Sequence, residues 1–255
     1  MNPHQAVATR FDELVAAVAF RYGPLAQGIV LVLYEELIAL RRVLADDPEA
    51  FVVRARARSI AAELAGQYER HGFRPVTDHP SSVVGHDPCV IQFSRRVFED
   101  KHGAVAHLVA AETVEITGPD LAFVESGRPY MYVIDEDGRF LVWTRAFSFE
   151  ELVFGRNRAT VGGVPVAHPM LVPERLRALA AGEIVFVGAP RVRAVIVNNK
   201  SGHFRTPPSS GEIVVNACRS RLGLTEADID LFIVGGVGSG TVQRIGQEID
   251  ERSER

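Results

Sequence analysis

Residues 130–144 read YMYVIDEDGRFLVWT, two apolar runs of β-branched and aromatic residues around a short polar turn. The turn ends in Asp137-Gly138, and an Asp-Gly pair between such runs is the strongest short-range signal for a β-hairpin. This stretch therefore predicts an antiparallel pair of strands. It indicates that the surrounding part of the chain is built on a sheet.

The sequence that follows predicts further strands and then helices. Residues 182–187 and 191–197 predict a second hairpin, joined across Gly188-Ala-Pro. Residues 211–222 predict a helix with Ser209 or Ser210 as its N-cap, and a strand is expected at 231–234. Shorter elements are expected at 89–93 (strand), 104–111 (strand or helix), 113–117 (strand), 147–154 (short helix) and 159–166 (strand).

The first third of the chain is helical in its pattern. Helices are expected at 12–20, 25–44 and 49–70, and in the second of these apolar residues recur every three or four positions. Three prolines then mark residues 75–88 as a linker or loop.

The predicted organisation is therefore a helical N-terminal segment (1–74), this linker, and an α+β domain (89–255). The fold class is α+β, with the helical segment packed on a mixed, mainly antiparallel sheet and with helices returning near the C-terminus.

Composition limits the classes of function. The 255 residues are 47% hydrophobic and 24% charged with a formal net charge of −4, so bulk charge predicts no nucleic-acid binding. The most membrane-like run, Ile29–Tyr34, is far shorter than a membrane span, and no signal peptide is indicated. Cys89 and Cys218 have no metal-like spacing. A soluble protein in the reducing cytoplasm is the simpler interpretation, with one long-range disulfide as the alternative.

The densest polar group follows the strand predicted at 191–197. The segment Val195–Ser210 runs from β-branched residues directly into Asn, Lys, Ser, Gly and His, and then into Pro-Pro. A histidine titrates near neutrality and a carboxylate can orient it, so an acid/base group is predicted. The candidate catalytic residues are His203, His168 and Glu183, and the candidate ligand-binding residues are Asn199, Lys200, Ser201 and Gly202.

Other interpretations of these residues stay open. Asn199, Ser201 and His203 could simply hold a tight strand-to-helix turn through local hydrogen bonds. Glu183, just before the predicted strand, would then be a surface residue. The histidines lack the close spacing of a typical metal motif, so no metal is predicted, and the cofactor is unknown. The glycine-rich residues 235–240 could cradle a phosphate, but a flexible connection to the C-terminal tail is the favoured interpretation.

Three segments occur in the same order as in a known module. They are His168-Pro169-Met170, Ala180-Ala181-Gly182-Glu183-Ile184, and Asn199-Lys200-Ser201-Gly202-His203-Phe204 with Pro207. Together they resemble a pattern in plant IQ-motif calmodulin-binding proteins and some bacterial toxin-like or uncharacterised proteins. That pattern runs His-Ser-Ser, Ala-Ala-Gly-Glu and Asn-x-Ser-Gly-His-Tyr-x-Pro. The resemblance covers about residues 130–234.

The chain departs from this pattern in several places. Phe204 stands where the pattern has Tyr, Pro207 comes one position late, and Pro169-Met170 replace the two serines. No IQ-type calmodulin helix is present in the sequence, so a calmodulin role is not carried over. The resemblance implies a site at the matched residues without implying an activity.

Two functions are consistent with the sequence. The first is an enzyme, such as a transferase or hydrolase, that acts on a nucleotide-like or otherwise anionic small substrate through His203. The second is a non-catalytic regulatory protein that binds a ligand or a partner. The sequence leaves a homo-oligomer open.

Overall fold

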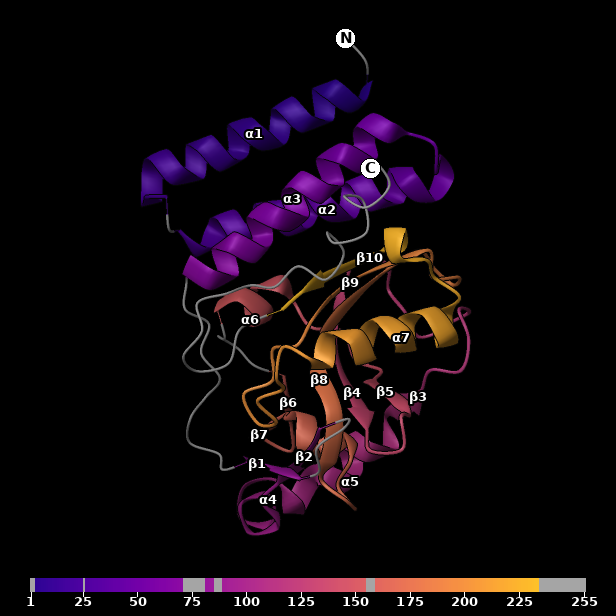
Figure 1. Ribbon diagram of the computed structural model, residues 1–255. Helices are drawn as coiled ribbons and strands as arrows, with labels where there is room; N and C mark the ends of the chain where they lie inside the picture. The colour runs from indigo at the N-terminus through magenta and orange to yellow at the C-terminus, as the bar shows by residue number, and fades with distance from the viewer. Residues whose placement is uncertain (1–2, 25, 71–80, 85–88, 155–158, 234–255) are drawn as a thin grey trace, which may run out of the picture.

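The computed structural model describes residues 3–24, 26–70, 81–84, 89–154 and 159–233 (Figure 1). The α-helices are α1 (Pro3–Tyr22), α2 (Gln27–Asp46), α3 (Phe51–Arg70), α4 (Arg95–Lys101), α5 (Gly103–Ala111), α6 (Phe149–Phe154) and α7 (Ser210–Leu222). The strands are β1 (Ser81–Val84), β2 (Val90–Phe93), β3 (Thr113–Glu115), β4 (Pro129–Asp135), β5 (Phe140–Trp143), β6 (Thr160–Val161), β7 (Val164–Pro165), β8 (Arg177–Val187), β9 (Ala194–Asn198) and β10 (Ile229–Phe232). Two short 3₁₀ helices are η1 (His168–Leu171) and η2 (Glu226–Asp228).

Within the described residues, eight strands form one mixed sheet, in which β9 and β10 pair in parallel and the other pairs of neighbouring strands are antiparallel. The α+β prediction is therefore confirmed, with helices α1–α3 before the sheet and α7 near its end. None of the helices in the described part of the chain is long and apolar enough to cross a membrane.

Strand β8 is the centre of the sheet. Because β4 pairs along Ala178–Val185 of β8, strands β2 and β9 share the other edge of β8. On that edge, β2 pairs at Arg177–Ala178 and β9 pairs at Ile184–Val187. Among the described residues no strand pairs with residues 179–183 on this edge. The backbone N–H and C=O groups on this edge therefore need other hydrogen-bond partners. Side chains of the candidate site provide them.

Both hairpins expected from the sequence are present. In the first, Tyr132 of β4 lies opposite Val142 of β5, and Val133 lies opposite Leu141. Gly138 in the turn has a φ of 75°. In the second, β8 and β9 pair in the predicted order. The left-handed backbone at Gly138 is one that glycine adopts at little cost, which is why Asp-Gly favours this turn.

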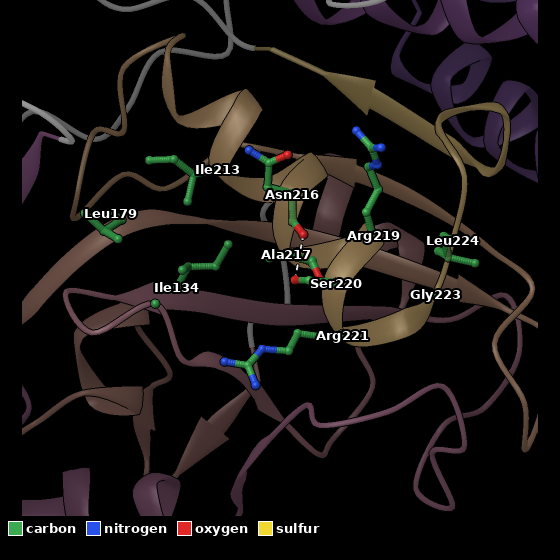
Figure 2. A pocket seen from close by; sticks show the side chains of 11 residues that line it. Ile134, Leu179, Ile213, Asn216, Ala217, Arg219, Ser220, Arg221, Gly223 and Leu224 are labelled. Atoms are coloured by element: carbon green, nitrogen blue, oxygen red, sulfur yellow. Dashed lines mark hydrogen bonds between the residues drawn. The ribbon is translucent and has the colours of Figure 1, made fainter.

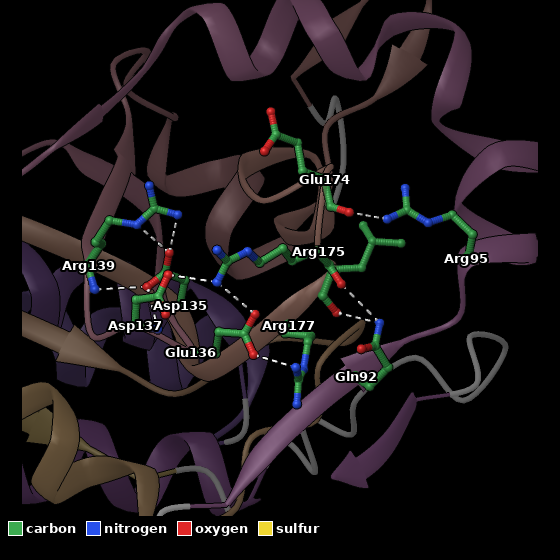
Figure 3. Close-up of polar contacts among 10 residues, drawn as sticks. Gln92, Arg95, Asp135, Glu136, Asp137, Arg139, Glu174, Arg175 and Arg177 are labelled. Carbon is green, nitrogen blue, oxygen red and sulfur yellow. Dashed lines mark hydrogen bonds and ion pairs between the residues drawn. The ribbon is translucent and has the colours of Figure 1, made fainter.

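Ion pairs surround the turn of the first hairpin (Figure 3). The buried Asp135 carboxylate accepts hydrogen bonds from the backbone N–H groups of Asp137 and Arg139. Arg175 lies 3.1 Å from Glu136 and 2.8 Å from Asp137, and Arg177 contacts Glu136 from β8. These contacts hold the turn against the start of β8, and since most are exposed they add little stability each.

The two faces of the sheet are covered differently. Successive residues of a strand point to opposite faces. In β4, Tyr130, Tyr132 and Ile134 pack in a core under α7, whereas Met131 and Val133 pack with α4, α5 and η1. We call these the α7 core and the α5 core. Helix α7 crosses one face of the sheet, and α4 and α5 lie at the end of the molecule farthest from α1–α3 (Figure 1).

The N-terminal helices join the sheet through a third core. Val185, Ile196 and Phe232 from three strands pack against α2 and α3 in what we call the helical core. Arg41 of α2 forms two hydrogen bonds of 2.6 Å with the Asp230 carboxylate, and both residues are buried. Paired charges of this kind tie two elements together in one geometry, here α2 and β10.

The structure also decides one open expectation and corrects several others. Residues 104–111, expected as strand or helix, form helix α5. Residues 159–166 form the small β6–β7 hairpin instead of the expected single strand. Residues 75–88, predicted as linker or loop, include strand β1. Helix α4, begun by a hydrogen bond between the Ser94 side chain and the Val97 backbone, was not predicted. The expected cap at Ser209 makes no side-chain cap hydrogen bond. Residues 235–240 lie outside the described residues.

Candidate functional site

Three histidine rings converge beside the end of β9. His203 lies in the turn between β9 and α7, His168 begins η1, and His102 joins α4 to α5. The centre of the His203 ring is 5.6 Å from that of His102 and 6.5 Å from that of His168. The structure thus brings together the two predicted histidines and adds His102.

His203 is the most accessible of these three rings. Its ring is half-buried, whereas His102 and His168 are buried. The edge-to-face contacts with His102 and with Phe93, whose ring centre is 5.8 Å away, fix the plane of the His203 ring. A ring that is fixed and still reaches solvent is the form in which a histidine can exchange a proton with a bound molecule.

His168 is suited to a different role. Its Nε2 donates a hydrogen bond of 3.1 Å to the carbonyl oxygen of Gly182. Burial, together with the positive charge of Lys200, lowers the pKa of His168 to about 4 even though the hydrogen bond to Gly182 raises it. His168 is therefore neutral near pH 7. Its hydrogen bond ties η1 to the middle of β8.

The pH dependence of stability tests this assignment. The folded pKa of His168, about 4, lies below its unfolded value of 6.5, so protons bind the unfolded chain preferentially as the pH falls through 6.5. The stability contributed by neutral His168 is complete above that pH. By about pH 4 as much as about 3 kcal/mol is lost.

His168→Asn keeps an N–H donor and removes the titration. We expect its free energy of unfolding, from urea melts, to depend less on pH than that of the wild type between about pH 6.5 and about pH 4. Identical pH profiles for the two proteins would contradict a buried, neutral His168.

Glu183 lies inside β8 and not just before a strand, as the sequence suggested. Its side chain is 14% exposed. Asn198 Nδ2 donates a 2.8 Å hydrogen bond to Glu183 Oε2, and Asn198 Oδ1 accepts from the backbone N–H groups of Glu183 and Lys200. Asn198 therefore links the predicted carboxylate to the predicted lysine and occupies part of the unpaired edge of β8.

Lys200 contacts both Glu183 and helix α6. Its Nζ is 3.7 Å from Glu183 Oε1 and donates a 3.0 Å hydrogen bond to the carbonyl oxygen of Leu152 in α6. Its charge also reaches His168, as the lowered pKa of that ring indicates. An ammonium group is a compact point charge of the kind that binds anions.

Two tyrosines of the helical core border this polar group. Tyr34 of α2 and Tyr68 of α3 share a 2.6 Å hydrogen bond between their hydroxyl groups. Burial raises the pKa of Tyr34, and the negative charge of Glu183 raises it further. Burial likewise raises the pKa of Tyr68. Both tyrosines therefore stay protonated near neutral pH.

Asn199 and Ser201 stabilise the turn between β9 and α7 through local hydrogen bonds. Ser201 Oγ accepts a 3.2 Å hydrogen bond from the backbone N–H of Phe204, and Asn199 Nδ2 donates to the carbonyl oxygen of Thr206. The Thr206 hydroxyl in turn contacts the carbonyl oxygens of Asn199 and Ala181. Both predicted ligand-binding side chains are buried and engaged in these local bonds. Gly202 is half-buried in the same turn.

The open pocket of about 860 Å³ beside α7 is a separate feature (Figure 2). Its lining includes Ile134 and Leu179 of the α7 core. The Phe204 side chain beside His203 and the Phe98 side chain that contacts His102 belong instead to the α5 core. The pocket therefore opens on the other face of the sheet from the histidines.

Within the described residues, no group of three or more His, Cys, Asp or Glu side chains is arranged to hold a metal ion. Cys218 is buried in the α7 core, where burial raises the pKa of its thiol to about 12. The thiol is therefore not a nucleophile near neutral pH.

Comparison with known proteins gives no family. No protein-family model, no curated protein and no solved structure matches this chain. The geometry of the site therefore carries the functional argument.

Proposed function

We propose that this protein is an enzyme, a transferase or hydrolase, that acts on a small anionic, nucleotide-like substrate. The proposal rests on one observation: a half-buried His203, fixed by two aromatic contacts, lies in the same turn as Lys200. His203 is the acid/base group, and Lys200 attracts the anion. Glu183 and His168 hold these groups in place. The resemblance of the same segments to the Ser-Gly-His module supports this choice of site.

Lys200 and His203 have different chemical roles, anion binding and proton transfer. An ammonium group binds a phosphate or carboxylate as a point charge, but it remains charged near neutral pH and is a poor proton carrier. An imidazole gains or loses a proton in the physiological range. A neutral His168 adds no second positive charge beside His203 in the same pH range.

A second function is favoured by the bonds inside the turn. Because Asn199 and Ser201 are occupied by Thr206 and Phe204, their side chains support the structure of the turn. In a non-catalytic, ligand-binding regulator this turn would present Lys200 and His203 to a ligand without turnover. The two functions share a binding site and differ only in whether product forms.

The experiment is a thermal-unfolding screen with nucleotides, phosphorylated metabolites and inorganic phosphate. A ligand at about 100 times its Kd stabilises the native state by about 2.7 kcal/mol. For a chain of this size that corresponds to a rise in Tm of about 5–10 °C. Product analysis of each stabilising compound then separates the enzyme from the regulator. A screen without any Tm shift would contradict both and would favour a regulatory protein that binds a partner.

A further inference from the structure

Helix α1 carries an exposed face that is apolar near its centre and charged toward its ends. The residues of this face, 10, 13, 14, 17, 20 and 21, recur at three- and four-residue spacings and are all exposed. Phe20 is 95% exposed and Leu14 is 41% exposed. Of the seven large apolar side chains exposed in the described residues, five lie in α1 and α3 (Leu14, Phe20, Tyr22, Phe51, Val52).

The opposite face of α1 is held against the protein. Val15, Val18 and Ala19 pack on the helical core. Asp12 forms an ion pair of 2.5 Å with Arg56 of α3. These contacts fix the rotation of α1 about its own axis, so the exposed face points outward. In Figure 1, α1 is the outermost helix.

The exposed face has a symmetric pattern centred on Ala17. Leu14 precedes Ala17 by three residues and Phe20 follows it by three, whereas Glu13 precedes it by four and Arg21 follows it by four. Glu13 and Arg21 form no ion pair within the described part of the chain, although Arg21 lies over the ring of Tyr22. The pattern is therefore apolar near its centre and opposite in charge at its two ends.

We propose that this face binds a second copy of the chain, with the two α1 helices antiparallel and crossing at Ala17. The two-fold axis of such a pair places Leu14 at the same level as Phe20 of the other copy, and Glu13 at the same level as Arg21 of the other copy. The small Ala17 side chain allows the helices to approach closely. A helix of 20 residues is about 30 Å long, so the interface is small and the dimer is weak.

A second copy suits this face better than an unrelated partner. One face carries both Glu13 and Arg21 at equal distances from its centre, so it complements itself when turned through 180°. Each copy supplies both members of the two ion pairs and both sides of the apolar contacts. This proposal does not depend on the proposed function, because α1 is separate from the His203 turn.

Sedimentation velocity of the full chain tests the dimer. We expect the wild type to associate at micromolar concentrations and Phe20→Glu to be monomeric at the same concentrations. Phe20 is almost fully exposed, so the variant should keep its thermal unfolding midpoint. The matched control is Val52→Glu, which places the same charge at an exposed apolar residue of α3 outside this face and should leave association unchanged.

Charge reversal tests the pairing of residues. Glu13→Arg alone and Arg21→Glu alone each place like charges opposite one another twice, and we expect association at least about tenfold weaker for each. Mixing the two variants restores opposite charges at both contacts, so the mixture should associate like the wild type. A wild-type chain that stays monomeric up to about 1 mM would overturn the proposal. A mixture no stronger than either variant alone would also overturn it.

Discussion

Gly182→Ala is expected to destabilise the protein by about 3 kcal/mol or more. A Cβ atom on Gly182 would lie 2.1 Å from the carbonyl oxygen of Asn198 and 2.9 Å from its carbonyl carbon. These are backbone atoms at the end of a buried strand, so they cannot move aside as a flexible side chain can. The same Asn198 oxygen accepts a 2.8 Å hydrogen bond from Tyr132. Relieving the clash therefore displaces β9 and the start of the His203 turn.

The measurement is urea unfolding followed by circular dichroism, with Gly118→Ala as the matched control. At Gly118 nothing lies within 4 Å of an added Cβ, and its backbone is not left-handed. We expect Gly118→Ala to stay within about 0.5 kcal/mol of the wild type. If Gly182→Ala behaved like this control, the close approach of β8 and the end of β9 would be wrong, and with it the placement of Glu183 beside Lys200.

His203→Phe is expected to lower kcat by about 10²- to 10⁴-fold, the usual contribution of an acid/base side chain. The substrate for this measurement is the stabilising compound from which the wild type forms product. Phenylalanine keeps an aromatic ring for the contacts with Phe93 and His102 but carries no proton. The variant should therefore fold with a Tm close to that of the wild type, and the loss should appear in rate and not in stability.

The matched control is His107→Phe, which makes the same exchange at an exposed histidine of α5. It should keep the wild-type kcat. Full activity in a folded His203→Phe variant would reject the catalytic role of His203 and would favour the ligand-binding regulator. Loss of activity in both variants would point to a general effect of replacing histidine and would also contradict the assignment.

The elements with strong local signals could be predicted from the sequence. The Asp137-Gly138 turn and its flanking runs give the β4–β5 hairpin. Helix α7 ends at Gly223, whose φ of 68° is the left-handed conformation that glycine commonly adopts at the C-terminus of a helix. The fold class follows from the same local patterns, because long helices come first and short strands come after them.

Other elements could not be predicted because tertiary packing decides them. Strand β8 begins at Arg177, earlier than the sequence predicts. The run Ala178-Leu-Ala-Ala has little β propensity, so it gives no strand signal, and it is pairing with β4 that stabilises it as a strand. That earlier start places Glu183 in the middle of the strand and not near its beginning. Residues 104–111 form helix α5, although the periodicity of their apolar residues does not distinguish a helix from a strand.

The arrangement of the candidate site could be predicted in part. The strand-end cluster indicated the region, and the structure brings His168 and His203 within 6.5 Å of each other. His102 was missed because it joins the other histidines only through the packing of α4 and α5, and a single histidine between two short helices carries no pattern in the sequence. The functions of Asn199 and Ser201 in the turn also depend on Thr206 and Phe204, whose positions only the fold reveals.

The most direct test of an anion site at Lys200 and His203 is the ligand-induced Tm shift of Lys200→Met. Methionine keeps the length of the side chain and removes its charge. The control is Arg191→Met, which removes an exposed cation whose described ion pair is with Asp120. With the compound that most stabilises the wild type, we expect Arg191→Met to keep the full shift and Lys200→Met to lose most of it. An equal shift in both variants would contradict the account, because the anion would then bind elsewhere.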